Sequence, residues 1–165
     1  MTFSRTGNAG LFRSAFSYTQ RMLVKEVMSP LVVTLTPEET LLDAIDRLRS
    51  NHIRHLPVIE GSTLVGIVTD RDVKRATPSV LSGVDQEEYD RVIATTRVVQ
   101  FMTRDPLTVT PATNLKAAIE LFIDRKIGAI PVVEGGRLVG ILSDIDILRV
   151  ARDLLGRVDG PTGSR

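Results

Sequence analysis

The stretch LVGIVTDRD, residues 64–72, recurs almost unchanged as LVGILSDID at residues 138–146. In both places an apolar run with a glycine leads into a threonine or serine and then into two aspartates one residue apart. An offset of 74 residues aligns 27–73 with 101–147 without a gap, and 18 of these 47 positions are identical. A repeat at a fixed offset indicates that one supersecondary unit is used twice. The chain is therefore a tandem duplication.

Each copy predicts the same order of elements. A short extended run (32–36 and 107–110) ends at Pro37 or Pro111, and proline suits the first turn of a helix. Apolar residues at helical spacing then predict amphipathic helices near 38–50 and 112–125. Two apolar strands joined by a glycine turn predict a hairpin, and the Thr-Asp or Ser-Asp pair predicts the start of a second helix. The sequence therefore predicts an α/β fold of two β-α-β-β-α repeats.

The expected boundaries follow from this pattern. We expect the first repeat at 22–80, a linker with a short helix at 81–97 and the second repeat at 98–158. Residues 159–165 have the composition of a disordered tail. Residues 1–21 contain three of the five phenylalanines, three arginines and no acidic residue. Such a segment suits a transit peptide, a stretch upstream of a true start at Met22, or a flexible extension, and we expect the last.

The composition excludes several classes of protein. The 21 basic and 20 acidic residues nearly balance, which gives no pull toward nucleic acid or membrane surfaces, and only 4% of residues are aromatic. The apolar runs fall far short of the roughly 20 residues that a membrane helix needs. The chain contains no cysteine, which excludes disulfides and thiolate metal sites and suits a reducing compartment. We therefore expect a cytoplasmic protein.

The two copies resemble a tandem pair of CBS domains, the module first named from cystathionine β-synthase. The resemblance covers about 24–76 and 98–150 and is greatest to stand-alone pairs of the acetoin-utilisation AcuB type. It implies that the repeats pack with pseudo-two-fold symmetry and bind an adenosine ligand in the cleft between them. It also implies a homodimer. The motifs that carry it are VMSP, TLTP, IRHLPVIEGSTLVGIVTDRD, FMTRDPLTVTP and KIGAIPVVEGGRLVGILSDID.

The resemblance also implies site residues. A hydroxyl at a helix N-terminus, where free N–H groups favour an anion, would hold phosphate, and an aspartate one turn on would accept the ribose hydroxyls. A glycine in the preceding strand lets backbone or ligand come close. A Thr-Asp pair is also a common helix start that needs no ligand, so capping alone stays open as an alternative. The candidates are Thr69 and Ser143 for phosphate, Asp72 and Asp146 for ribose, Thr34 and Thr108 for the base pocket, and Gly66 and Gly140 for close approach.

The copies differ where Arg54 and His55 of the first face Gly128 and Ala129 of the second. With Arg71, Lys74 and Arg75 nearby in sequence, the first copy has more cations for phosphates. We expect the Asp72 site to take the more highly phosphorylated nucleotide, and the Asp146 site to bind a nucleoside or to stay empty. The alternative is that these cations are solvated helix faces.

The predicted function is regulatory binding of AMP, ADP, ATP or S-adenosylmethionine without chemistry, with no other cofactor and no metal. The output would act on an unknown effector protein. A structural dimerisation scaffold with empty clefts is the alternative. An Asp-x-Asp motif after a strand also resembles the nucleophile of haloacid-dehalogenase-type phosphatases. The duplication and the short chain argue against that enzyme, and the two histidines, His52 and His55, complete neither a catalytic triad nor a zinc site.

Overall fold

The computed structural model describes residues 22–79, 83 and 85–158, so the predictions for 1–21 and 159–165 lie outside the described residues. The first repeat contains α2 (Leu41–Ser50), β1 (His55–Glu60), β2 (Thr63–Thr69) and α3 (Asp70–Ala76). The second contains α5 (Leu115–Arg125), β4 (Ala129–Glu134), β5 (Arg137–Ser143) and α6 (Asp144–Val158). The described residues also form helix α4 (Gln86–Thr95), strand β3 (Thr103–Arg104) and two 3-10 turns, η1 (Val24–Glu26) and η3 (Val98–Gln100).

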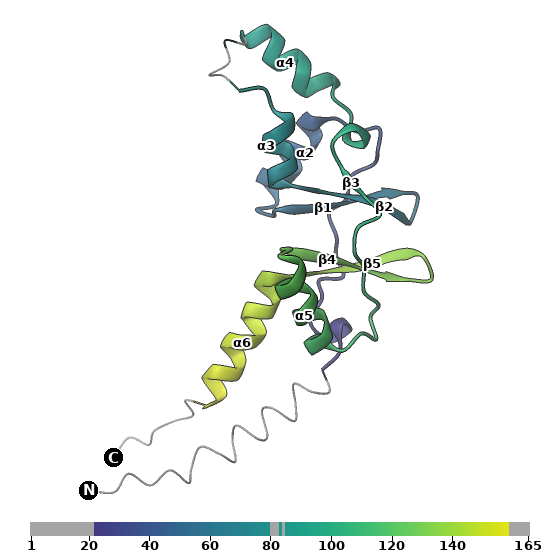
Figure 1. The fold of residues 1–165 in the computed structure, drawn as a ribbon, viewed down its shortest axis with the longest axis vertical. Coiled ribbons are helices and arrows are strands. Elements are labelled where there is room, and N and C mark those ends of the chain that lie inside the picture. The colour runs from purple at the N-terminus through teal and green to yellow at the C-terminus, as the bar shows by residue number, and fades with distance from the viewer. Residues whose placement is uncertain (1–21, 80–82, 84, 159–165) are drawn as a thin grey trace, which may run out of the picture.

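The two hairpins face each other in the middle of the molecule (Figure 1). Helices α2 and α3 cover the outer side of β1 and β2, helices α5 and α6 cover the outer side of β4 and β5, and α4 lies beyond α2 and α3. The hairpins join into one sheet, in the order β1-β2-β5-β4, where Thr63 pairs with Arg137. The predicted α/β fold of two repeats with pseudo-two-fold symmetry is therefore confirmed.

Each repeat has its own core, but each core takes a valine from outside its repeat. Val98 of η3 is fully buried among the residues of the first repeat, and Val24 of η1 is fully buried among those of the second. Burying a valine side chain contributes roughly 1.5–3 kcal/mol. Residues 22–29 and 98–104 are here called the exchanged segments, because each begins one repeat in sequence and packs on the other.

Backbone hydrogen bonds hold the exchanged segments in place. The N–H of Val24 donates to the carbonyl of Thr113 at 2.9 Å, and the N–H of Val98 donates to the carbonyl of Glu39 at 2.8 Å. Further on, Ser29 pairs with Ile141, and β3 pairs with β2. Each exchanged segment therefore contacts both the turn before the first helix and the second hairpin strand of the opposite repeat.

The first predicted strand of each repeat is shorter than expected. Instead of strands over 32–36 and 107–110, single parallel bridges join Leu35 to Val58 and Val109 to Val132. In the first copy, the next bond on one side would need an N–H from Pro57, and the next bond on the other side would need one from Pro37. Proline has no N–H, so the ladder stops at one bridge. Pro131 and Pro111 have the same effect in the second copy.

The first helix of each repeat also begins three residues later than predicted, at Leu41 and at Leu115. Thr40 and Asn114 act as N-caps, because their side chains accept hydrogen bonds from the N–H groups of Asp43 and Lys116. The residues after each proline form a turn before the helix instead of its first turn. Among the described residues, no helix is both long enough and apolar enough to cross a bilayer.

Candidate functional site

The helices that follow each hairpin begin with the same arrangement of side chains. At the start of α3, the carboxylate of Asp72 accepts hydrogen bonds from the N–H of Thr69 at 2.9 Å and from its hydroxyl at 2.7 Å. At the start of α6, the carboxylate of Asp146 accepts the equivalent bonds from Ser143 at 2.9 and 2.6 Å. In both, the hydroxyl oxygen in turn accepts from the aspartate N–H at 3.3 Å. Each pair is thus a reciprocal capping box.

These bonds use only one oxygen of each aspartate. The second oxygen of Asp72 lies 3.7 Å from Arg75, and that of Asp146 lies 3.1 Å from Arg149. Asp146 is buried, with 6% of its surface exposed. The structure therefore contains the capping geometry in full, and the assignment of these four residues to phosphate and ribose stays a prediction.

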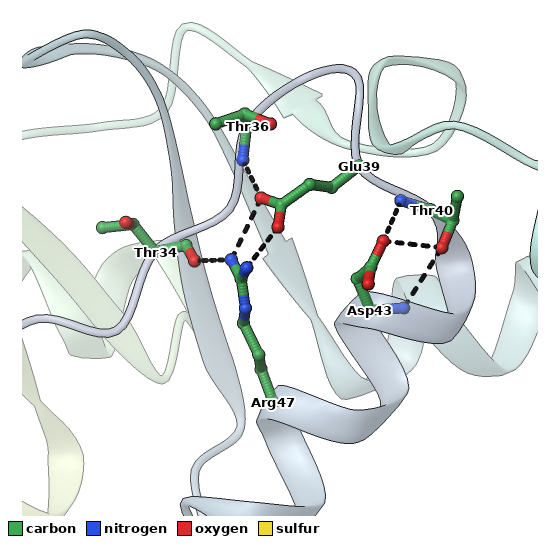
Figure 2. Close-up of polar contacts among 6 residues, drawn as sticks. All are labelled: Thr34, Thr36, Glu39, Thr40, Asp43 and Arg47. Atoms are coloured by element: carbon green, nitrogen blue, oxygen red, sulfur yellow. Dashed lines mark hydrogen bonds and ion pairs between the residues drawn. The ribbon is translucent and has the colours of Figure 1, made fainter.

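A third capping box provides a comparison. At the start of α2, Asp43 accepts from the N–H and the hydroxyl of Thr40 at 2.8 and 2.7 Å (Figure 2). These two bonds hold the pKa of Asp43 below its ordinary value. Neither Thr40 nor Asp43 is among the residues that line the two clefts described below. The box by itself therefore does not mark a ligand site.

Two clefts lie between the repeats, and each is built from both. Cleft 1 has a volume of about 430 Å³ and combines the start of α3 with the loops before α5 and β4. Cleft 2 has a volume of about 460 Å³ and combines the start of α6 with the loops before α2 and β1. Both volumes lie within the range of about 300–1,000 Å³ that is typical of small-molecule sites. Thr69, Asp70, Arg71, Thr103, Leu107 and Lys126 line cleft 1, and Ser143, Asp144, Asp146, Arg149, Val33 and His52 line cleft 2.

Four residues line both clefts, namely Arg54, His55, Ala129 and Asp144. The Arg54 guanidinium donates to both carboxylate oxygens of Asp144, at 3.0 and 2.8 Å. Arg54 and His55, which belong to the same repeat as Asp72, therefore lie against both clefts. The pseudo-two-fold packing places the loop of one repeat against the helix start of the other, and the assignment of these two residues to ligand binding stays a prediction.

Of the other basic residues expected near Asp72, one lines a cleft and two lie on the exposed face of α3. Arg71 lines cleft 1. Lys74 lies 3.3 Å from Asp70 on the next turn of α3, and Arg75 lies near Asp72. The alternative of solvated helix faces thus describes Lys74 and Arg75, whose side chains are 77% and 79% exposed.

His55 lies in the wall between the clefts, where its ring packs against Gly128. A Cβ atom on Gly128 would lie 2.8 Å from the ring carbon Cε1 of His55. Burial lowers the pKa of His55, and the nearby Arg54 and Arg71 lower it further, while Asp144 and Asp70 oppose the shift. The contact between the two repeats therefore favours the neutral form of His55.

Thr34 and Thr108 are not among the residues that line either cleft within the described chain. The carbonyl of Thr34 accepts a hydrogen bond from Arg47, which also forms an ion pair with Glu39 (Figure 2). The apolar wall of each cleft comes from the residues just before, Val32 and Val33 in cleft 2 and Pro106 and Leu107 in cleft 1. A base-binding role for Thr34 and Thr108 stays a prediction.

His52 and Lys126 are among the lining residues that the sequence interpretation did not assign to the site. His52 and Lys126 occupy equivalent positions after α2 and α5, and both have a φ of 53°, in the left-handed region. Glycine is the usual residue there, because other side chains cost roughly 1–2 kcal/mol in that conformation. A non-glycine residue with a left-handed φ carries backbone strain, and such strain is often found at binding sites. Here both copies carry it, and both strained residues line a cleft.

Comparison with known proteins identifies the family. The CBS domain model matches residues 24–79 and 98–153. A CBS domain-containing protein of Dictyostelium discoideum is 32% identical over 143 residues, which are 86% of this chain and 96% of that protein. An inosine-5'-monophosphate dehydrogenase of Korarchaeum cryptofilum is 36% identical over 117 residues, which are 70% of this chain. The chain spans only 21% of that enzyme's length, so the likeness concerns one part of it.

Solved structures share the fold. A candidate acetoin utilization protein (AcuB) from Vibrio cholerae has a TM-score of 0.71 and 30% identity, over 86% of this chain and 98% of that one. CBSX2 of Arabidopsis thaliana in complex with AMP has a TM-score of 0.68 and 31% identity, over 81% and 98%. The CBS domain pair of protein MJ0100, in complex with 5'-methylthioadenosine and S-adenosyl-L-methionine, has a TM-score of 0.66 and 26% identity, over 80% and 97%. Together with the two matches to the family model, the shared fold shows that this chain belongs to the CBS-domain family, as a tandem pair.

Proposed function

We propose that this chain is a regulatory module that binds an adenosine-containing ligand, AMP, ADP, ATP or S-adenosylmethionine, in the clefts between its repeats and modulates a partner protein. The observation that carries the proposal is the construction of each cleft from both repeats, with a helix start on one wall and apolar residues on the other. The AMP complex of CBSX2 and the methylthioadenosine and S-adenosylmethionine complex of MJ0100 support the class of ligand.

The construction of the clefts also supports a regulatory role. A ligand that contacts both walls favours the arrangement of the repeats in which those walls are correctly spaced. It can shift that equilibrium only by its differential affinity for the two arrangements, and a protein that contacts both repeats would then sense the shift. Ligand binding and output therefore require no catalytic step on this chain.

The clefts favour different ligands. Cleft 1 is lined by Arg54, Arg71 and Lys126 against two aspartates, whereas cleft 2 is lined by Arg54 and Arg149 against two aspartates. Cleft 1 thus has the more positive surroundings. We assign the more highly phosphorylated nucleotide to cleft 1 and a nucleoside-type ligand to cleft 2.

A scaffold with empty clefts is the second candidate, because three large apolar side chains on the helices of the second repeat are exposed. Ile123 of α5 and Leu148 and Leu155 of α6 are 67%, 61% and 64% exposed. Leu148 and Leu155 are seven residues apart and so share one face of α6, and an exposed apolar face suits contact with another protein. We propose that it pairs two copies of the chain as a homodimer, which is compatible with either function.

The capping boxes provide a matched experiment. Thr69→Ala, Ser143→Ala and Thr40→Ala each remove one N-cap hydroxyl, and each should lower the free energy of unfolding by about 0.5–2 kcal/mol. If the clefts bind nucleotides, only Thr69→Ala and Ser143→Ala also weaken AMP, ADP or ATP binding in calorimetry. Equal stability losses in all three variants with unchanged ligand affinity would establish the capping role alone.

Thermal unfolding separates the two candidates. A ligand that binds only the folded state raises its stability. A rise in the unfolding temperature with any of AMP, ADP, ATP or S-adenosylmethionine supports the regulatory module. No rise with any of the four at millimolar concentration would leave the scaffold as the function.

A further inference from the structure

The Arg54 side chain lies at the boundary of the two clefts. Its guanidinium comes from the loop before β1 of the first repeat and pairs at 2.8 Å with Asp144, the first residue of α6 in the second repeat. The two side chains are 55% and 41% exposed. Exposed ion pairs contribute only about 0–1 kcal/mol, so a phosphate group can replace the Asp144 carboxylate at little cost.

The pseudo-symmetry supplies no second cation of this kind. The position equivalent to Arg54 is Gly128, and the aspartate equivalent to Asp144 is Asp70. A Cβ atom on Gly128 would lie 2.8 and 2.9 Å from two atoms of the His55 ring, so His55 occupies the space that a side chain there would need. The Asp70 carboxylate instead pairs with Lys74 of its own helix, at 3.3 Å. One arginine therefore faces two clefts.

The charge balance of each cleft depends on where this arginine points. With Arg54 turned to cleft 1, cleft 2 keeps Arg149 against Asp144 and Asp146. Arg149 is itself bound to Asp146 at 3.1 Å, so Asp144, which lines both clefts, has no cation beside it on the cleft 2 side, whereas in cleft 1 Arg54 still lies between its carboxylate and the phosphate. An unpaired carboxylate repels phosphate, whereas an uncharged nucleoside is indifferent to it.

From this geometry we propose that Arg54 is a shared selectivity residue. Its engagement by a phosphate in cleft 1 makes cleft 2 selective for a ligand without phosphate, so the two clefts bind phosphorylated ligands with negative cooperativity. This inference rests on the proposed function, and it adds which residue couples the two sites and in which direction.

Calorimetry with AMP and with adenosine on the whole chain tests the inference. In the unmodified protein, AMP should fill one cleft tightly and the other at least 10-fold more weakly, whereas adenosine should fill both without this difference. In Arg54→Ala the tight AMP step should weaken by about 10- to 100-fold, since a charged hydrogen bond is lost, and adenosine binding should stay unchanged.

Two control variants each act on one cleft. Lys126→Ala, which changes a residue that lines cleft 1 alone, should weaken only the tight AMP step. Arg149→Ala, which changes a residue that lines cleft 2 alone, should leave that step in place.

Asp144→Asn keeps the side-chain oxygen that accepts from the Ile145 N–H at 2.8 Å but removes the charge that holds Arg54. It should strengthen the tight AMP step and reduce the difference between the clefts.

The outcomes separate the inference from the function on which it rests. Equal AMP affinity at both clefts of the unmodified protein, or an equal loss of AMP and adenosine binding in Arg54→Ala, would overturn the shared role of Arg54 while leaving nucleotide binding intact. Failure of AMP and adenosine to bind the unmodified protein would overturn this inference, and failure of ADP, ATP and S-adenosylmethionine as well would overturn the proposed function with it.

Discussion

The sulfur of Met102 packs directly on the backbone of Gly66, at 2.6 Å from the point where a Cβ atom would stand. In the second copy, Met28 lies in the same way on Gly140, at 2.7 Å. Both methionines belong to the exchanged segments. Each second hairpin strand thus has a glycine at the same position, and the exchanged segment that begins the other repeat packs against it. We expected these glycines to admit backbone or ligand, and the structure shows backbone and methionine there.

We predict that Gly66→Ala lowers the free energy of unfolding by about 1–3 kcal/mol, because the added methyl group meets both the Met102 sulfur and the carbonyl of Thr103, at 3.0 Å. Urea denaturation measures this. Gly156→Ala in α6 is the control, since no atom lies within 4 Å of its added methyl, and alanine there should be neutral or stabilising by up to about 1 kcal/mol. Equal effects of the two changes would contradict the packing argument.

The ion pair of Arg47 with Glu39 predicts a coupling between two positions (Figure 2). Glu39 also accepts from the N–H of Thr36 at 2.6 Å. The second copy has leucine and threonine at the equivalent positions, and there the hydroxyl of Thr113 accepts from the N–H of Thr110 at 3.0 Å. The second copy thus reaches the same turn without charges.

Arg47→Leu and Glu39→Thr should therefore each destabilise the chain alone, because each leaves one charged partner behind. The double variant should cost less than the two single losses added, with a coupling of about 0.5–3 kcal/mol. A double-mutant cycle in denaturant measures it, and strictly additive losses would show that the pair does not interact in solution.

Lys126→Gly should raise stability and lower ligand affinity together. Lys126 has a left-handed φ of 53°, which glycine adopts without a Cβ penalty, so the free energy of unfolding should rise by up to about 1 kcal/mol. The loss of its charge from cleft 1 should weaken AMP binding. His52→Gly, at the equivalent strained position, should stabilise the chain and leave cleft 1 unaffected. A loss of stability in Lys126→Gly would refute the strain argument.

His55 predicts a pH dependence of stability. Its pKa in the folded chain lies below the ordinary value of 6.5, chiefly because of burial, so the unfolded chain takes up the proton first as the pH falls. The free energy of unfolding should therefore be fully retained above pH 6.5 and should decline as the pH drops below it toward the folded pKa. The groups that face His55 are Arg54, Arg71, Asp70 and Asp144.

His55→Ala, which introduces the residue of the second copy, should remove this part of the pH dependence. Denaturation curves between pH 5 and 8 measure it, and His52→Ala is the control that should leave the decline in place. An unchanged decline in His55→Ala would assign the pH dependence to other groups.

Local patterns predicted most of the fold. The helical spacing of Leu41, Ala44 and Leu48 predicts the buried face of a helix from a short segment of sequence alone. All three residues are buried. The Thr69-Asp72 spacing likewise predicted the helix start. The single-residue bridges were missed because they depend on which N–H groups two prolines remove from a ladder between distant segments.

The cleft residues were harder to predict because they depend on how the repeats pack. Arg54 is close in sequence to Asp72, but its side chain meets Asp144, 90 residues away. No local sequence pattern predicts that the loop before β1 of the first repeat faces the start of α6 in the second. The left-handed φ of Lys126 was also invisible, because the sequence shows a lysine where a glycine would have signalled the turn.

The exchanged segments also constrain how the chain folds. Val24 is synthesised before the residues of the core that receives it, which include Leu115, Ile130 and Leu142. The first repeat in turn lacks Val98 until the linker has been made. Contacts between such distant residues must wait for a long loop to close, which slows folding. On the ribosome, the first repeat therefore emerges with an incomplete core, and that core is completed only after Val98 has been synthesised.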